Sequence, residues 1–198
     1  MTAQINDVFQ YQGDSYCIAG ISEGELFDPS VLELKPVGTC SACWRGYLAD
    51  FGVVDQHVAL INLHTQLCSD DEEMRPIQGP VINGISPKPK DDEDDWFNNH
   101  YLDINFHLEY SGGLLIADRF IEELYVHMGF HPAWKYETVH ELIFANGVLT
   151  AAHNRSEQMA EIRDRFLSDD LPTREPTSRD IHKFVEDAFD RSYPMGRF

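Results

Sequence analysis

Two pairs of cysteine and histidine residues have the chemistry of a metal site. Cys40 and Cys43 form a CxxC, and His64 and Cys68 form an HxxxC further along the chain. Thiolates and imidazoles are the ligands that zinc prefers, and a CxxC can alternatively carry redox exchange. The second pair, however, falls in or beside a predicted strand, where residues four apart lie roughly 13 Å from each other. We therefore favour reduced, inert thiols and expect no cofactor.

A row of polar residues could instead act as general acid and base. Residues 101–110 alternate apolar and polar side chains, which is typical of a strand with one buried and one solvated face. The polar face carries Asp103, Asn105, His107 and Glu109. Either His107 or His127 could exchange protons with Asp103 or Glu109 in a pocket of the sheet. A plain solvated strand face is the other interpretation.

The familiar catalytic motifs are incomplete. His140-Glu141 begins an HExxH, but the second histidine is missing. His127 and His131 have the spacing of a helical metal pair, yet Gly129 lies between them and Pro132 follows. No GxSxG, Walker loop or dinucleotide fingerprint occurs. The sequence thus favours a protein without catalytic activity, and an enzyme or small-ligand-binding protein is the alternative.

The charge is strongly negative. The 198 residues include 34 acidic and 15 basic side chains, which gives a net charge of -19 at pH 7. Such a field repels nucleic acid and anionic membranes and attracts cationic partners, although solubility alone could explain it. No stretch is apolar enough to span a bilayer, and residues 1–7 lack the features of a signal peptide. We expect a cytoplasmic protein with neither nucleic acid nor membrane as a partner.

The acidic residues concentrate around an aromatic pair. Blocks at 70–73 and 91–95 bracket a proline-bearing segment, and Trp96-Phe97 follows the second block. Aromatic anchors among carboxylates suit the capture of a basic protein, because the rings supply burial and the charges speed association. Alternatively, both rings only pin the loop to the core. The predicted partner-binding residues are Asp91, Asp92, Glu93, Asp94, Asp95, Trp96 and Phe97.

These observations predict a non-catalytic acidic binding protein. An immunity protein or inhibitor that neutralises a basic partner, such as a cationic toxin or nuclease, would have this charge and size. An inhibitor that mimics DNA is a further possibility, and it requires carboxylates spaced like phosphates along one surface.

The elements that must position these residues are mostly strands. We expect a hairpin over residues 7–22, strands at 44–51 and 58–67, and a short strand at 81–85. A second hairpin turns at Asn146-Gly147, because both residues tolerate positive φ. Residues 101–110 are predicted as the central strand, which reverses at Ser111-Gly112-Gly113 and pairs with 114–117. Residues 118–130 fit helical and strand spacing equally.

The C-terminal part changes to helical periodicity. One amphipathic helix begins at Ser156, and another begins at Ser178 after a linker at 171–177. Strands followed by helices predict an α+β, mainly β fold: a curved antiparallel sheet, as a meander, sandwich or barrel, with C-terminal helices. We assign residues 1–154 to a β domain with acidic loops at 69–99, and residues 155–198 to a helical segment docked on it.

Overall fold

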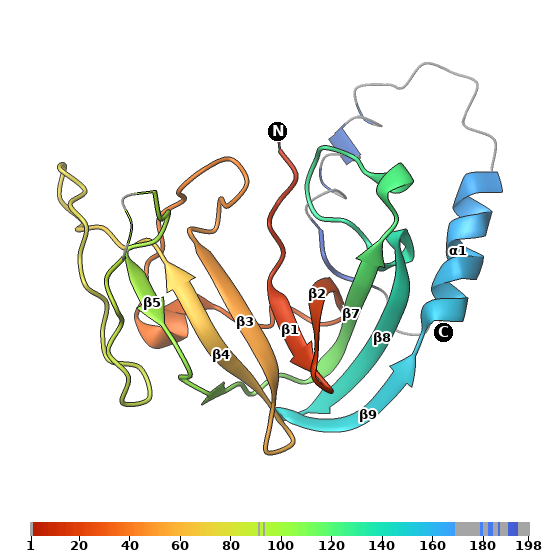
Figure 1. Ribbon diagram of the computed structural model, residues 1–198, viewed down its shortest axis with the longest axis horizontal. Helices are drawn as coiled ribbons and strands as arrows, with labels where there is room; N and C mark the ends of the chain where they lie inside the picture. The colour runs from red at the N-terminus through yellow and green to blue at the C-terminus, as the bar shows by residue number, and fades with distance from the viewer. Residues whose placement is uncertain are drawn as a thin grey trace.

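The fold is a closed β-barrel with one helix on its outside (Figure 1). The computed structural model describes residues 2–90, 92, 94–168, 179, 182–183, 186 and 190–193. Seven strands form the barrel in the order β3-β1-β2-β7-β8-β9-β4, and the pairing of β3 with β4 closes it. Their bounds are β1 Val8–Tyr11, β2 Asp14–Ile21, β3 Tyr47–Val54, β4 His57–Thr65, β7 Gly112–Phe120, β8 Tyr136–Ala145 and β9 Val148–Asn154. The predicted mainly β class is confirmed.

Two strand pairings in the barrel are unusual. β1 and β3 pair in parallel, whereas the other strand pairs are antiparallel. β4 and β9 share a single register pair, His57 with Val148. Figure 1 shows these two strands meeting at their starts and diverging beyond them.

The hairpins predicted from turn chemistry are confirmed. β8 and β9 are joined by Asn146-Gly147, with φ of 48° and 81°. β1 and β2 are joined by Gln12-Gly13, with φ of 54° and 92°. Positive φ at both turn positions matches the twist of the flanking strands, and glycine adopts it without a steric cost.

The predicted central strand over residues 101–110 is wrong. Two short strands occupy its ends, β5 (Asn99–Tyr101) and β6 (Phe106–His107), and both pair with β4 at the side of the barrel. Between them, Asp103 and Asn105 have left-handed backbones, with φ of 56° and 45°. Asp and Asn tolerate this conformation, so the chain turns at each of them and still directs the alternate apolar residues inward. The period-two pattern therefore predicted correctly which side chains point inward, but it predicted a continuous hydrogen-bonded strand where the chain turns.

Two other local predictions also fail. Residues 114–117 belong to β7, which pairs with β2 and β8 and not with 101–110. Residues 81–85 form a tight turn, closed by hydrogen bonds between Ile82 and Ile85, in place of a strand. The ambiguous residues 118–130 divide: β7 continues to Phe120, and a single 3-10 turn, η2 (Glu122–Leu124), precedes an irregular loop. Two more 3-10 turns are η1 (Pro29–Leu32) and η3 (Ala133–Lys135).

Apolar side chains form two clusters. The larger one fills the barrel and includes Phe9, Phe51 and Leu114. The smaller one lies between the outer face of the sheet and α1 (Ser156–Ser168), where Met159 packs with Val139. The predicted helix start at Ser156 is confirmed, and the helix predicted from Ser178 falls largely outside the described residues.

The division into a β domain and a docked helical segment stays a prediction. In the described part of the chain, no helix combines the length and the apolar character that a membrane crossing requires.

Candidate binding surface

The acidic loops form an excursion from the side of the barrel, between the end of β4 and β5. Two asparagines hold it in place. Asn98 bonds both backbone groups of Leu67, at 2.7 and 2.9 Å. Asn99 donates to Ile77 O at 2.9 Å and accepts from Gly79 N at 2.8 Å. These amides take the place of ladder hydrogen bonds, so the excursion has a defined shape although it contains little regular structure.

The two neighbouring aromatic residues have different roles. Phe97 is 6% exposed, whereas Trp96 is 50% exposed. The Phe97 N–H donates to Asp95 Oδ1 at 3.0 Å, which fixes the turn between the carboxylates and the rings. Phe97 therefore anchors the segment to the protein, which is the role that the simpler interpretation gave to both rings. Trp96 lies on the surface instead.

Trp96 borders a groove of about 480 Å³. The groove has mostly apolar walls, which include Pro76, Ile77, Pro87 and Pro89. Exposed aromatic and apolar side chains around a concave surface are typical of interaction sites, where a partner side chain can be buried.

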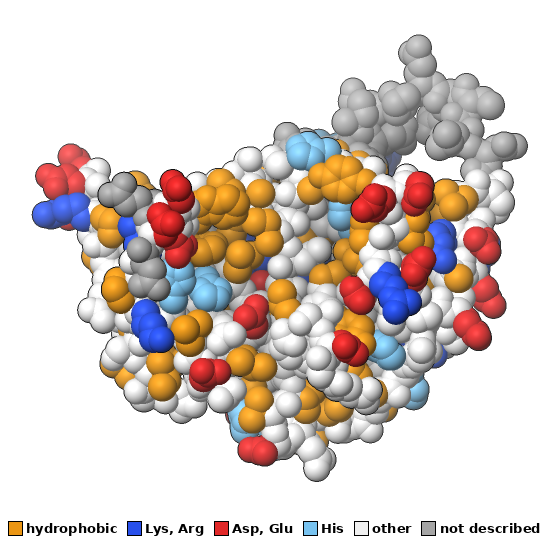
Figure 2. Space-filling model, viewed as in Figure 1, with side chains coloured by type: hydrophobic (Ala, Val, Ile, Leu, Met, Phe, Trp, Pro, Cys, Tyr) orange, Lys and Arg blue, Asp and Glu red, His pale blue; other side chains and the backbone are white. Residues whose placement is uncertain are grey.

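The groove is lined by charged side chains of both signs, and one of them is Lys90. Asp95 contributes to its wall, and Asp92 and Asp94 are exposed nearby in sequence. Neither Asp92 nor Asp94 has an ion-pair partner among the described residues. Asp91 and Glu93 lie outside the described residues. Figure 2 shows acidic, basic, apolar and histidine side chains at the left of the molecule, over the region where Figure 1 places β5.

The other acidic block, at residues 70–73, is partly neutralised. Asp70 pairs with Lys35 at 3.0 Å, and Arg75 pairs with Asp71 at 3.0 Å and with Glu73 at 3.2 Å. This block therefore attracts a cationic partner less strongly than its acidic residues alone would, and Lys90 in the groove wall likewise opposes the charge of the block beside Trp96.

A chain of ionisable groups anchors this segment to the barrel. His64 Nδ1 on β4 lies 2.7 Å from His100 Nδ1 on β5. His100 Nε2 lies 3.0 Å from Asp95 Oδ2 and 3.2 Å from Phe97 O. Because Nε2 faces two acceptors it carries a proton, so Nδ1 of one ring must accept from the other. Burial and the adjacent His100 lower the pKa of His64, although Asp50 and Asp95 oppose this shift.

Acidification should loosen this anchor. Burial and the adjacent His100 lower the pKa of His64, so the neutral ring is the form that the fold favours and protonation of His64 weakens the fold here. Stability from this contact is complete above the ordinary histidine pKa of about 6.5 and is lost as the pH falls below it. We expect the protection factors of amides 95–101, which correct for the slower intrinsic exchange at lower pH, to fall between pH 7 and pH 5 relative to those of the β8–β9 hairpin.

The matched variants are His100→Gln, which removes the pair, and His153→Gln, which changes an exposed histidine on β9. The His100→Gln variant should lose the pH dependence of the protection factors at amides 95–101, and the His153→Gln variant should keep it. Equal behaviour of wild type and His100→Gln would contradict the role of the histidine pair.

The four residues of the zinc hypothesis do not share a common site, since each pair has other partners. His64 faces His100, Cys43 is buried and donates to Tyr47 O at 3.3 Å, and Cys68 accepts from Gln66 Nε2 at 3.6 Å. Cys40 forms a β-bridge with Cys43. Burial raises the pKa of Cys43, which keeps it a thiol. The described residues contain no group of three or more histidine, cysteine or acidic side chains that could hold a metal ion.

The polar row of residues 103–109 is exposed. Asp103, Asn105, His107 and Glu109 are all on the surface. His107 stacks on His57 with ring centroids 4.9 Å apart, while His127 bonds the hydroxyl of Tyr125 at 2.8 Å. The contacts of His127 are thus with another part of the chain. These five residues line neither the groove beside Trp96 nor the larger cavity beside Asp7.

The sequence did not indicate His100 as a site residue. Its pairing with His64 depends on the register of β4 and β5, which joins residues 36 positions apart. The chain matches no protein-family model, and no curated protein or solved structure is significantly similar to it.

Proposed function

We propose that the protein binds a basic protein partner through the groove beside Trp96. The observation that carries this proposal is the different burial of two adjacent rings: Phe97 is buried as an anchor, and Trp96 is held half exposed on an apolar groove. A ring presented on a firmly anchored segment loses little conformational freedom on binding, which favours its use as a hot spot.

The charges around the groove define the partner. Asp92 and Asp94 lack cationic partners in the described part of the chain, and the whole chain carries a charge of -19. They would accelerate association with a cationic surface and repel acidic ones. The partner is therefore a basic protein that inserts an apolar side chain beside Trp96. An inhibitor or immunity protein directed against a cationic toxin would act in this way.

Replacing Trp96 by alanine should reduce capture of the partner at least about tenfold, because truncation of a central aromatic anchor removes a hot spot. The measurement uses the full chain as immobilised bait in lysate of its own cells, at low and at moderate salt, with bound proteins quantified by mass spectrometry. The control bait is Trp44→Ala, since Trp44 is 54% exposed and lies outside the groove.

A second pair of baits tests the role of the charge. Asp92→Asn with Asp94→Asn should weaken capture more than Glu157→Gln with Glu161→Gln, which removes the same charge from exposed positions on α1. The proposal fails if no basic protein is enriched, or if the Trp96→Ala and Trp44→Ala baits retain the same proteins equally.

A small-ligand-binding protein remains the second candidate. The specific observation that favours it is a separate cavity, which shares no residue with the groove.

A further inference from the structure

The larger cavity, of about 700 Å³, lies against the interior of the barrel. Its lining includes the core side chains Ile18 and Phe51, and the loop at 24–36 contributes a further wall. The cavity is also lined by Asp7, Arg45, Tyr47, Phe130 and residues 190–192. Volumes of about 300–1,000 Å³ are typical of small-molecule sites. The lining of this cavity combines apolar core side chains with charged ones.

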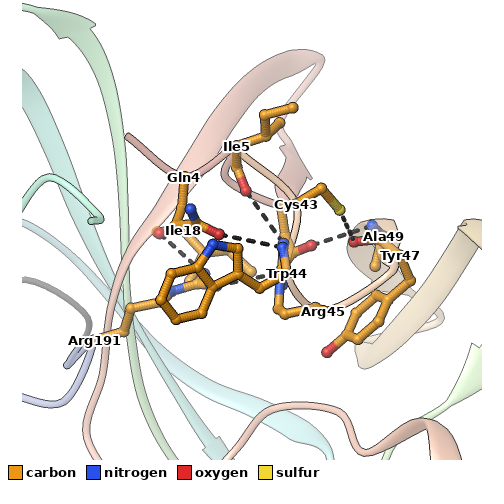
Figure 3. A network of polar contacts seen from close by, with 10 residues as sticks. Gln4, Ile5, Ile18, Cys43, Trp44, Arg45, Tyr47, Ala49 and Arg191 are labelled. Atoms are coloured by element: carbon orange, nitrogen blue, oxygen red, sulfur yellow. Dashed lines mark hydrogen bonds and ion pairs between the residues drawn. The ribbon is translucent and has the colours of Figure 1, made fainter. Parts of the chain in front are cut away.

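A buried ion cluster forms one wall of this cavity. Asp7 is 5% exposed, and its Oδ2 lies 2.5 Å from Arg45 Nη1 and 3.1 Å from Arg191 Nη1. Asp7 Oδ1 accepts from Ala49 N at 3.1 Å. The Phe130 ring lies 5.8 Å from Arg45 Cζ and 4.7 Å from Arg191 Cζ. Figure 3 shows the two arginines within this network of polar contacts.

The two guanidinium groups retain unused hydrogen-bond donors. Each has five N–H groups. Arg45 directs one at Asp7 and one at Ile5 O, at 3.2 Å, and Arg191 directs one at Asp7 and one at Ile18 O, at 3.1 Å. Arg191 Nε is buried without a hydrogen-bond partner among the described residues. A buried donor without an acceptor costs stability. The side chains of Arg45 and Arg191 are 22% and 12% exposed, and their remaining N–H groups are the donors that a ligand in the cavity could use.

The charges in this wall do not cancel. Two mostly buried arginines face one buried carboxylate, which leaves one positive charge inside a strongly acidic protein. The other acidic side chains of the lining, Glu25, Asp28 and Asp190, are exposed. Interactions between buried charges are stronger than those at the surface, where water and salt screen them. An anionic group therefore belongs at the arginines, and the acidic rim disfavours a second anion at the opening.

We propose that this cavity binds a small apolar monocarboxylate. The carboxylate accepts hydrogen bonds from Arg45 and Arg191, whose planar forks match its geometry. The apolar body of the ligand packs against Phe130 and the core side chains. Tyr47, which also lines the cavity, supplies a neutral hydroxyl, because burial, followed by the charge of Asp7, raises its pKa.

The test uses octanoate labelled with ¹³C at its carboxyl group, followed by NMR as the full-length protein is added, with benzoate as a second probe. We expect a saturable shift of the carboxyl resonance. Octanedioate should bind at least about tenfold more weakly than octanoate, because its second carboxylate meets the acidic rim, whereas 8-aminooctanoate should keep its affinity. Equal binding of octanoate and octanedioate would overturn the assigned orientation.

Two variants locate the site. Arg191→Gln should weaken octanoate binding about tenfold or more, since a charge-assisted hydrogen bond is lost. Ser30→Trp fills the cavity from its exposed edge without changing the ion cluster, so it should abolish binding even if the first variant folds poorly. The proposal is overturned if neither probe binds saturably, or if Ser30→Trp, shown to be folded by its amide NMR spectrum, binds octanoate like the wild type.

Discussion

Replacing Asp7 by alanine should lower the free energy of unfolding by about 3–5 kcal/mol, because removal of one partner leaves buried charges uncompensated. Arg45 and Arg191 both pair with this carboxylate, and their side chains are 22% and 12% exposed. The variant also leaves the Ala49 N–H without its acceptor. The measurement is chemical denaturation followed by circular dichroism at neutral pH.

The control for this prediction is Asp71→Ala. Asp71 also pairs with an arginine, Arg75, but both side chains are well exposed. Exposed ion pairs contribute little, since water screens the charges and ordering the side chains costs entropy. If the Asp7 and Asp71 variants unfold at nearly the same denaturant concentration, the buried cluster does not stabilise the fold as we infer.

Acid should destabilise the protein through His131. This side chain is 9% exposed, and its Nε2 is buried without a hydrogen-bond partner among the described residues. Burial, followed by the charge of Lys135, lowers the pKa of His131 to about 4. In the unfolded chain the ring takes up a proton near pH 6.5, so the unfolded state is favoured as the pH falls from 6.5 towards 4. The expected loss from this residue is about 2 kcal/mol at pH 5, relative to pH 8.

The matched substitution is His131→Phe, which keeps the ring contacts with Phe120 and Tyr125, at 4.7 and 5.3 Å between centroids, and removes the titrating group. Unfolding free energies of the two proteins should differ by about 2 kcal/mol more at pH 5 than at pH 8. The exposed substitution His153→Gln should leave the pH dependence of the wild type unchanged. Parallel pH profiles for wild type and His131→Phe would contradict the lowered pKa.

Local turn chemistry predicted much of the barrel. Gln12-Gly13 and Asn146-Gly147 specify hairpins through short-range backbone preferences, and these hairpins are present. Residues 101–110 show where such reasoning stops. An alternating pattern records which side chains are buried, but it does not show that Asp103 and Asn105 turn the backbone between them.

The candidate sites were less predictable than the fold. The acidic and aromatic composition indicated Trp96 and Phe97, yet only the structure separates the buried ring from the exposed one. The ion cluster had no local pattern at all. Arg45 and Arg191 are 38 and 184 positions from Asp7, so their meeting depends on how the whole chain folds.

The span between Asp7 and Arg191 also has a consequence for biosynthesis. Translation runs from the N-terminus, so Asp7 and Arg45 leave the ribosome well before residues 190–193. The early pair can form at once, but the later arginine, together with the backbone bonds that join Ile21 to Arg191 and Tyr193, must wait until residues 190–193 have been made. Contacts of such long sequence separation form slowly. Completion of the cavity lined by Asp7, Arg45 and Arg191 is thus expected to follow the assembly of the hairpins.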